Sequence, residues 1–267
     1  MPNAKEIEAT RTTILNVGST GSGKTAGFLT LPGKKFLYIF DPNTLATLMG
    51  HDVEYELFSP EHLDLDAVTL KANVRDRIST APSPSAYIEF EKHIEKNMDT
   101  DFFDNFDVIG LDSITTFQDT IMDRITHLNG RFGKQPEMTD YVATTNTVIK
   151  VFRTLLSFNK LVYVTGHIDF RQEEATSKMM NVMDFIGRLR RRIPILFSEV
   201  WYSYGEPDKQ DKMHYFVRTQ QDRYNPYLRC TNRFIDPTED VTIDWTKPPE
   251  GQGIGGLLER SNIVQGA

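Results

Sequence analysis

The amino-acid sequence predicts an α/β fold with a mostly parallel sheet flanked by helices and with antiparallel hairpins at the C-terminal edge. First, short apolar runs rich in β-branched residues alternate with stretches of helical periodicity. Second, these runs are apolar almost throughout, which is typical of strands buried on both faces of a parallel sheet. Third, from about residue 199 the strands follow one another without long helices. At 267 residues the chain is near the upper size of one domain, so one domain with insertions is expected.

Each expected strand is an apolar run bounded by turn residues. These runs are residues 12–17, 35–40, 53–58, 106–111, 161–166, 199–204, 213–218 and 227–234. The expected helices are residues 85–97, 114–128 and 139–158, and the last carries apolar residues close to one stripe at helical spacing. Pro, Gly and polar residues fill segments 81–85 and 129–138, where we expect mobile insertions.

Between the first expected strand and the next helix, the sequence GSTGSGKT matches the pattern G-x-x-x-x-G-K-[ST]. Glycines let the backbone point its N–H groups at phosphate oxygens, and the following helix adds its positive N-terminal end. The lysine reaches the β and γ phosphates, and the last hydroxyl can ligate Mg²⁺. A flexible Gly/Ser loop would match by chance in about 1% of such chains. The pattern therefore predicts a site for ATP and Mg²⁺, with Thr25 as a metal ligand, made of Gly18, Ser19, Thr20, Gly21, Ser22, Gly23, Lys24 and Thr25.

A magnesium-bound triphosphate also requires a carboxylate at the end of a neighbouring strand. The apolar run 108–111 ends in Asp112, which could hold a magnesium-bound water or orient it toward Thr25. An Asp at a strand end is more often a helix N-cap, and Ser113 could equally cap the helix that starts at residue 114. Because a phosphate loop is also predicted, the sequence favours Asp112 as the catalytic residue that binds or orients the Mg²⁺ ion.

Hydrolysis also requires a group that orients or deprotonates the attacking water. Asp41 follows the strand 35–40, whose carboxyl end should lie at the same crevice, so Asp41 is the candidate base. Its alternative role is an ordinary Asp-Pro-Asn turn. His167 ends the run 161–166 and could sense the γ-phosphate, or it could be a structural histidine satisfied by its neighbours. With only Asp169 nearby, His167 is weak support for a metal site.

Composition restricts the class of protein and its partners. The best apolar runs, such as residues 161–164, are far too short to span a bilayer, so no membrane partner is expected. The polar N-terminus lacks a secretory pattern and the single Cys230 cannot form an internal disulfide, so a reducing cytoplasm is expected. The net charge of −7 argues against general adhesion to nucleic acid, so any DNA contact must be local.

At residues 18–25, at LDSITTF from residue 111 and at VTGH ending in His167, the chain resembles the RecA-like P-loop ATPases, most of all the phage-encoded annealing and recombination group. The resemblance covers roughly residues 10–245, so we expect a RecA-like P-loop ATPase domain at 1–247 and a Gly-rich C-terminal tail at 248–267. It implies an ATPase in the host cytoplasm that acts on single-stranded DNA in recombination or replication. It also implies a homo-oligomer with ATP sites at subunit interfaces.

The resemblance assigns roles to individual residues as well. In RecA-like proteins the strand beside the phosphate loop carries a catalytic carboxylate, and a polar residue after a later strand couples the γ-phosphate to DNA-binding loops. These roles would map to the Asp41 region and to His167. RecA itself has a Glu shortly after the terminal Asp, whereas this chain has Asn43. The departure points to slow hydrolysis or to a protein that acts mainly as a nucleotide-gated binder.

Two groups of arginines are implied to act on anions. In the same family, cations from a late hairpin enter the neighbouring subunit's ATP site, and Arg229 and Arg233 lie four residues apart on the expected strand 227–234, which puts them on one face. They could equally be surface arginines of an edge strand. A second group occupies the region where the family places its DNA loops, and it comprises Arg188, Arg190, Arg191 and Arg192. These could neutralise DNA phosphates or form the solvated face of an amphipathic helix.

Two functions from different classes therefore remain open. The first is the ATPase acting on single-stranded DNA. The second is a nucleotide-gated assembly or loading factor whose arginine cluster meets an acidic protein surface. Other P-loop classes fit less well: residues 159–162 lack the Asp of a GTPase's guanine reader, and a small-molecule kinase would have to use a short lid such as 188–192.

Overall fold

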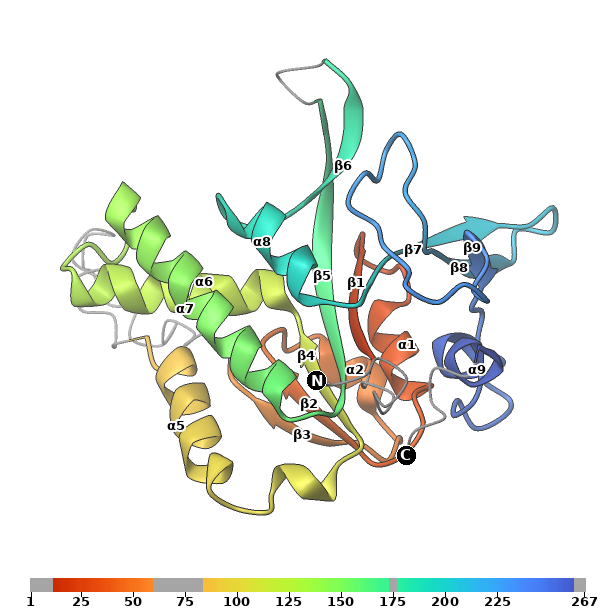
Figure 1. Cartoon of the computed structure of the whole chain (residues 1–267), viewed down its shortest axis with the longest axis horizontal. Coiled ribbons are helices and arrows are strands. Elements are labelled where there is room, and N and C mark those ends of the chain that lie inside the picture. The colour runs from red at the N-terminus through yellow and green to blue at the C-terminus, as the bar shows by residue number, and fades with distance from the viewer. Residues whose placement is uncertain (1–11, 60–83, 173–176, 262–267) are drawn as a thin grey trace, which may run out of the picture.

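The computed structural model describes residues 12–59, 84–172 and 177–261, and within these residues nine strands form a sheet (Figure 1). The strand order is β3-β2-β4-β5-β1-β7-β8-β9, and β6 pairs with the outer part of β5. The strands are β1 (Thr13–Gly18), β2 (Lys35–Ile39), β3 (Glu54–Leu57), β4 (Val108–Asp112), β5 (Leu161–Gln172), β6 (Met179–Met183), β7 (Glu199–Pro207), β8 (Met213–Arg218) and β9 (Thr238–Asp240).

The central part of the sheet is parallel. β1 pairs with β5 and β7, β4 pairs with β2 and β5, and β2 pairs with β3, all in parallel register. β8 and β9 add antiparallel pairs at the C-terminal edge. The predicted fold class is therefore confirmed. The carboxyl ends of β1, β2 and β4 lie together beside the middle of β5, since Gly18 stands opposite His167, Leu111 opposite Val164 and Ile39 opposite Asp112.

Helices cover both faces of the sheet, so the strands alternate between two apolar layers. On β1, Leu15 and Val17 belong to the cluster under α5, α6, α7 and α8, while Ile14 belongs to the cluster under α1, α2 and α9. This alternation explains why the strand sequences are apolar almost throughout. The helices are α1 (Lys24–Leu29), α2 (Thr44–Leu48), α5 (Ala86–Met98), α6 (Ile114–Leu128), α7 (Met138–Ser157), α8 (Leu189–Leu196) and α9 (Gly253–Arg260), with a 3₁₀ turn at Phe103–Asn105.

The three long helices expected from periodicity are present as α5, α6 and α7. β5 is longer than expected, because it continues past residue 166 to Gln172 and forms a two-stranded ribbon with β6 that projects from the sheet (Figure 1). Residues 169–172 of this ribbon are exposed, so they lack the apolar pattern of a buried strand. None of the helices in the described part of the chain is long and apolar enough to cross a membrane.

The strand expected at residues 227–234 is wrong. Only Arg229 makes a strand-like pair there, an isolated bridge in which its backbone N–H and C=O bond to Val200. Further along, the buried carboxylate of Glu199 accepts hydrogen bonds from the backbone N–H and the hydroxyl of Thr231, and the side chain of Asn232 accepts from the N–H of Phe234. These side-chain bonds replace the backbone bonds that a ladder would need.

The segment expected as a tail contains α9, which lies beside α1 (Figure 1). Its Ile254, Leu257 and Leu258 are buried in the second apolar cluster. The N–H of Gly255 also donates to the hydroxyl of Thr30 at 2.9 Å. Since Thr30 caps α1, α9 supports the helix that follows the phosphate loop.

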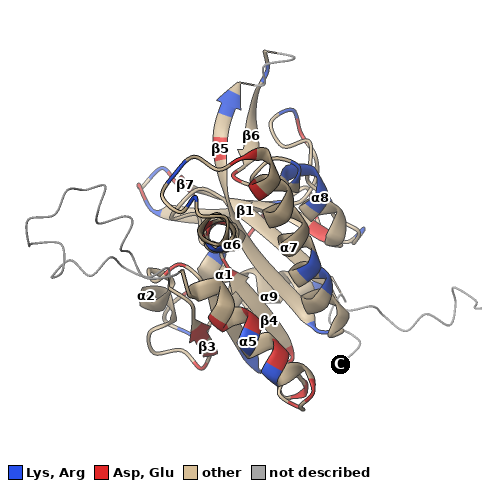
Figure 2. Ribbon diagram, turned by 90° about the vertical axis from the view of Figure 1, so that its left-hand side faces the viewer, with Lys and Arg blue, Asp and Glu red and all other residues tan. Residues whose placement is uncertain are grey.

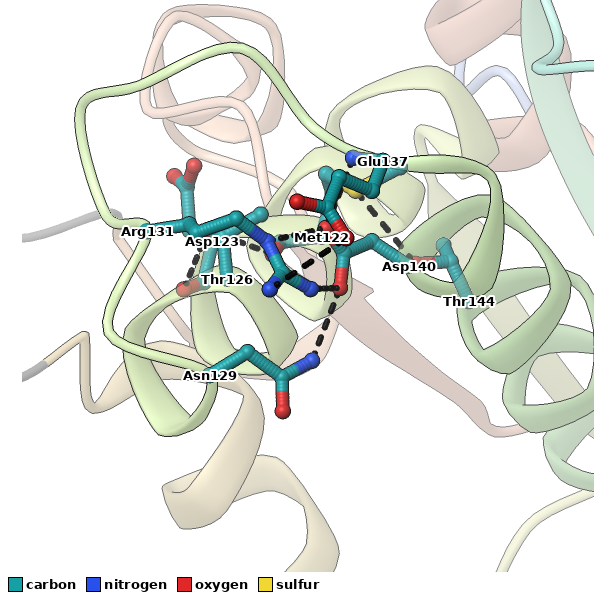
Figure 3. A network of polar contacts seen from close by, with 8 residues as sticks. All are labelled: Met122, Asp123, Thr126, Asn129, Arg131, Glu137, Asp140 and Thr144. Atoms are coloured by element: carbon teal, nitrogen blue, oxygen red, sulfur yellow. Dashed lines mark hydrogen bonds and ion pairs between the residues drawn. The ribbon is translucent and has the colours of Figure 1, made fainter.

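The loop between α6 and α7, expected to be a mobile insertion, is bound to the start of α7 by a polar network (Figure 3). The carboxylate of Asp140 is fully buried and accepts two hydrogen bonds from Arg131, at 3.0 and 2.6 Å. It also accepts from the side chain of Asn129 at 2.7 Å and from the N–H of Glu137 at 2.8 Å. A buried carboxylate with four donors fixes the loop geometry. Of the other expected insertion, residues 81–83 lie outside the described residues.

This network predicts a pH dependence of folding. The hydrogen bond from Arg131, followed by the one from the Glu137 amide, lowers the pKa of Asp140 from 3.8 to about 2. Because the folded-state pKa is below the unfolded one, the stabilisation is complete above pH 4 and is lost as the pH falls through about 2. We expect urea unfolding at pH 4, 3 and 2 to show a steeper loss of stability for the native chain than for Asp140→Asn. Asp52→Asn, at an exposed position, should retain the native slope, and equal slopes in all three proteins would contradict this role for Asp140.

Candidate functional site

The carboxyl ends of the central strands open into a cavity of about 400 Å³. Such a position is where ligands bind in open α/β sheets. The cavity brings together Lys24, Asp41, Asp112 and His167, which lie far apart in the sequence. It is further lined by Thr20, Gly21, Ser22, Gly23, Thr25, Ala26, Gly27, Asn43, Thr44, Thr47, Ser203, Tyr215, Val241, Ile243, Trp245 and Ile254. The predicted phosphate loop is therefore a wall of a real cavity.

Gly18 and Gly23 are required in the loop for different reasons. A Cβ on Gly18 would lie 2.3 Å from the carbonyl oxygen of Ser203, so the loop can approach β7 only without a side chain. Gly23 has φ of 81° and precedes α1, which no side chain caps. A Cβ there would also lie 3.2 Å from the Tyr215 ring. The backbone N–H groups of such a loop are the donors that cradle phosphate oxygens.

Lys24 lies beneath the loop that precedes it. Its ammonium group donates to the carbonyl oxygens of Gly18 at 2.9 Å and Ser19 at 2.7 Å. Burial lowers the pKa of Lys24 to about 8, while the nearby Asp112 carboxylate acts in the opposite direction. A partly desolvated ammonium group at the wall of a cavity attracts an anion more strongly than one in bulk water. Lys24 is thus placed to bind a polyphosphate.

A chain of buried polar groups fixes the strands under this loop. Ser203 on β7 donates to the side chain of Asn16 on β1 at 2.7 Å. Asn16 in turn donates to the hydroxyl of Tyr163 on β5 at 2.7 Å, and that hydroxyl donates to the carbonyl of Lys24 at 2.8 Å. Each buried polar group has a partner, as low dielectric surroundings require. The chain connects three strands to the start of α1.

Asp112 accepts hydrogen bonds from three threonine hydroxyls. One carboxylate oxygen accepts from Thr25 at 2.6 Å and from Thr44 at 2.9 Å, and the other accepts from Thr165 at 2.5 Å. Because Thr25 donates its proton to Asp112, the lone pairs of its hydroxyl oxygen are available to a cation. Hydroxyl and carboxylate oxygens are the hard ligands that Mg²⁺ prefers, and Mg²⁺ usually keeps water and substrate phosphates as its other ligands. The donor set therefore fits Mg²⁺.

Asp41 lines the cavity, but it does not lie on a strand beside the phosphate loop. Its strand β2 pairs with β3 and β4, whereas the neighbours of β1 are β5 and β7. One carboxylate oxygen of Asp41 accepts a hydrogen bond from the N–H of Asn43 at 3.0 Å. This bond is typical of an Asp-Pro-Asn turn, the alternative role considered for Asp41. Asp41 can form this turn and also face the cavity, since its other carboxylate oxygen takes no part in the bond to Asn43. Asn43 lines the cavity as well.

His167 lies on central β5, and its backbone N–H donates to the hydroxyl of Thr115 at 3.0 Å. Burial lowers the pKa of His167, and the positive charge of Lys24 lowers it further. The carboxylates of Asp112, Asp41 and Asp184 act in the opposite direction, but their effect is smaller. Its imidazole is therefore neutral at pH 7 and can accept or donate a hydrogen bond. Asp169 forms an ion pair with Arg171 instead, and the described residues include no group of three His, Cys, Asp or Glu that could hold a metal ion.

The two arginines expected on a late hairpin do not share a strand face, because residues 227–234 are not a strand. The guanidinium group of Arg229 donates to the carbonyl oxygens of Pro194 and Phe197 at the C-terminal end of α8. Cations commonly cap exposed carbonyls in this way, so within the chain Arg229 has a structural role. Arg233 is exposed in a turn.

The arginine cluster begins at the N-cap of α8, and Leu189 and Ile193 bury the opposite side of the helix, as expected for an amphipathic helix. Arg188, Arg191 and Arg192 are exposed, while Arg190 is also exposed but donates to the carbonyl of Phe185 at 2.8 Å. A groove of about 500 Å³ between α7 and α8 joins Arg192 to Lys150 and Arg153. Figure 2 shows the basic residues of α7 and α8 on the same side of the molecule. The groove is separate from the cavity at the phosphate loop.

Sequence reasoning did not identify Thr44, Thr165, Tyr215 or Trp245 as parts of the site. A signal was available for two of them: Thr44 follows β2, Thr165 lies on β5 two residues before His167, and parallel strands bring such positions to one edge of the sheet. Tyr215 and Trp245 gave no local signal. Their place at the cavity depends on the antiparallel edge and on the chain after β9.

A model of the AAA domain family matches residues 10–226. No curated protein matches the chain. Among solved structures, a KaiC-like protein from the hyperthermophilic archaeon Pyrococcus horikoshii OT3 is similar, with 13% identity, a TM-score of 0.44, and coverage of 89% of this chain and 87% of that chain. The phosphate loop, the Asp112 carboxylate and the family match together show that this chain belongs to the AAA domain family and is a nucleotide-binding P-loop ATPase domain.

Proposed function

We propose that this protein binds ATP with Mg²⁺, hydrolyses it slowly, and uses the cycle to act on single-stranded DNA in recombination or replication. The observation that supports ATP hydrolysis best is the hydrogen bond of 2.6 Å between Thr25 and Asp112 at the wall of the cavity that also holds Lys24. When bound, Mg²⁺ would be held by Thr25 and through Asp112, and it would neutralise charge on the β and γ phosphates.

Residues at the cavity have separate roles in the proposed ATP hydrolysis. Lys24 and the loop N–H groups bind the phosphates. Asp41 and neutral His167 face the same cavity and are the groups that could orient an attacking water or the γ-phosphate. Asn43, which stands where RecA carries a Glu, cannot act as a base, and this supports slow turnover.

Action on DNA is supported by the basic groove between α7 and α8, defined by Lys150, Arg153 and Arg192. In a chain with a net charge of −7, a local group of cations is the kind of surface that a phosphate backbone can bind. Arg188 and Arg191 extend this surface along α8. A homo-oligomer with ATP sites at subunit interfaces completes the proposal, with exposed Arg233 as the candidate cation that enters a neighbouring site.

The experiment is to measure ATP turnover and binding of a labelled oligo(dT) at several salt concentrations. We expect single-stranded DNA to raise turnover at low salt, and we expect binding to weaken linearly on a log–log plot against salt. Replacing Arg191 and Arg192 by Ala should reduce that slope by about 0.7 for each DNA phosphate that is no longer neutralised. Lys209→Ala, an exposed position on the β7–β8 hairpin, should retain the native slope.

The second candidate is a nucleotide-gated assembly or loading factor with a protein partner. The observation that favours it is Asn43 at the cavity, because a poor hydrolase can still switch between nucleotide-bound and free states. If DNA neither binds nor stimulates turnover at low salt while ATP still binds, the DNA proposal fails and this second candidate is supported.

A further inference from the structure

The lining of the cavity at the phosphate loop includes an apolar group of residues, the apolar end, that phosphate binding and Mg²⁺ do not use. We infer that the segment after β9 forms a stacking site for the base of the bound nucleotide, with the indole of Trp245 as its aromatic surface. This inference rests on the proposed binding of a nucleotide and extends it from the phosphates to the base.

The apolar end is formed by parts of the chain that lie far from the phosphate loop in sequence. Val241, Ile243 and Trp245 come from the segment after β9, Tyr215 comes from β8, and Ile254 comes from α9. A nucleotide has the same division, with a charged triphosphate at one end and a flat apolar base at the other. Ligand sites commonly combine apolar walls with a few polar groups in this way.

Trp245 is 55% exposed, although large apolar side chains are usually buried. The turn that presents it is firmly bound. The side chain of Gln252 accepts from the N–H of Asp244 at 2.8 Å and donates to the carbonyls of Asp244 and Pro248. The carboxylate of Asp244 accepts from the N–H and the hydroxyl of Thr246. The backbone turn that carries the exposed indole is therefore fixed at the cavity.

The neighbours of Trp245 position the stacking site relative to the phosphate loop. The ring of His51, after α2, lies 5.8 Å from the indole. Tyr215, another lining residue, packs so closely on Gly23 that a Cβ there would lie 3.2 Å from its ring. Since Gly23 belongs to the phosphate loop and Tyr215 to the apolar end, the two parts of the cavity are in direct contact. A base joined to phosphates on the loop can reach this apolar end without leaving the cavity.

The chemical class of the ligand is an aromatic base attached to a polyphosphate. Stacking of a base on an aromatic side chain contributes on the order of 1–3 kcal/mol, or about 5-fold to 150-fold in affinity. This contribution should be absent for a polyphosphate that has no base.

The test compares two ligands, MgATP and magnesium tripolyphosphate, by calorimetry on the whole protein. For Trp245→Ala we expect affinity for ATP to fall about 10-fold, while affinity for tripolyphosphate stays within about 2-fold. Trp245→Phe should restore most of the affinity for ATP. Phe234→Ala, which removes a ring that is 81% exposed outside the cavity lining, should change neither affinity.

Tryptophan fluorescence gives an independent measurement. The chain has two tryptophans, and Trp201 is fully buried, so a change on ligand binding reports mainly on Trp245. We expect ATP, but not tripolyphosphate, to change the emission. If Trp245→Ala binds ATP as tightly as the native protein, or if it loses both ligands equally, the stacking site is rejected while the proposed ATP binding stands. If the native protein binds neither ligand, the proposed function itself is rejected.

Discussion

Replacing Lys24 by Ala should lower the affinity for MgATP by about 100-fold or more and abolish measurable turnover. Hydrogen bonds to charged groups contribute about 1.5–3 kcal/mol each, and the ammonium group of Lys24 is both buried and aimed at its own loop. Removing it leaves the loop N–H groups without the cation that balances the phosphate charge. Affinity is measured by calorimetry and turnover by phosphate release.

A matched control separates loss of the site from loss of the fold. Lys209→Ala removes an exposed lysine from the β7–β8 hairpin and should leave affinity and turnover unchanged. The melting temperature of Lys24→Ala should stay close to that of the native chain, because alanine favours the helix α1 that starts at this position. Unchanged turnover in a folded Lys24→Ala protein would remove the basis of the proposed ATPase.

Replacing Asp112 by Asn should reduce Mg²⁺-dependent turnover by about 100-fold, with affinity for ATP reduced by less than about 5-fold. Asn keeps the size of the side chain and one acceptor oxygen but removes the negative charge. The hydroxyl of Thr25 then loses a charge-assisted partner at 2.6 Å. The cost should therefore appear in the step that requires the metal, because phosphate binding depends mainly on the loop and Lys24.

The ratio of the two losses is the informative quantity for Asp112. Turnover is measured as a function of Mg²⁺ concentration, and a higher Mg²⁺ requirement in Asp112→Asn would support the assigned role. Asp107→Asn, which changes a carboxylate at the opposite end of β4, is the control and should affect neither quantity by more than about 2-fold. Equal losses of affinity and turnover in Asp112→Asn would count against a metal-side role.

The sequence predicted the parts of the site that have a local signature. The phosphate loop follows a strand and precedes a helix, so its spacing alone defines the cradle. Asp112 and His167 could be placed because Asp112 ends an apolar strand and His167 follows an apolar run, and such positions on parallel strands meet at one edge of the sheet. Asp41 reaches the same cavity for this reason, although its strand does not lie next to β1.

The features that the sequence did not predict depend on contacts between segments that lie far apart in the chain. Arg229 looked like a free cation on a strand, but it caps the carbonyls at the end of α8, more than thirty positions earlier in the chain. The Glu199 carboxylate that bonds to Thr231 prevented the expected strand, and no local pattern shows such a bond. The helix α9 lies in a Gly-rich segment, which is typical of a loop, and three buried apolar residues are too few to produce a clear helical pattern there.

The most direct test of the account is a calorimetric titration of the native protein with MgATP at pH 8 in two buffers of different ionisation enthalpy. Burial lowers the pKa of Lys24 to about 8, so part of the free protein carries a neutral Lys24 at that pH. Bound phosphates favour the charged form, so nucleotide binding should be accompanied by proton uptake, and Lys24→Ala should abolish this uptake. A titration that shows no heat of binding, or binding with the same proton balance in Lys24→Ala, would contradict the claim that Lys24 and its loop hold the triphosphate.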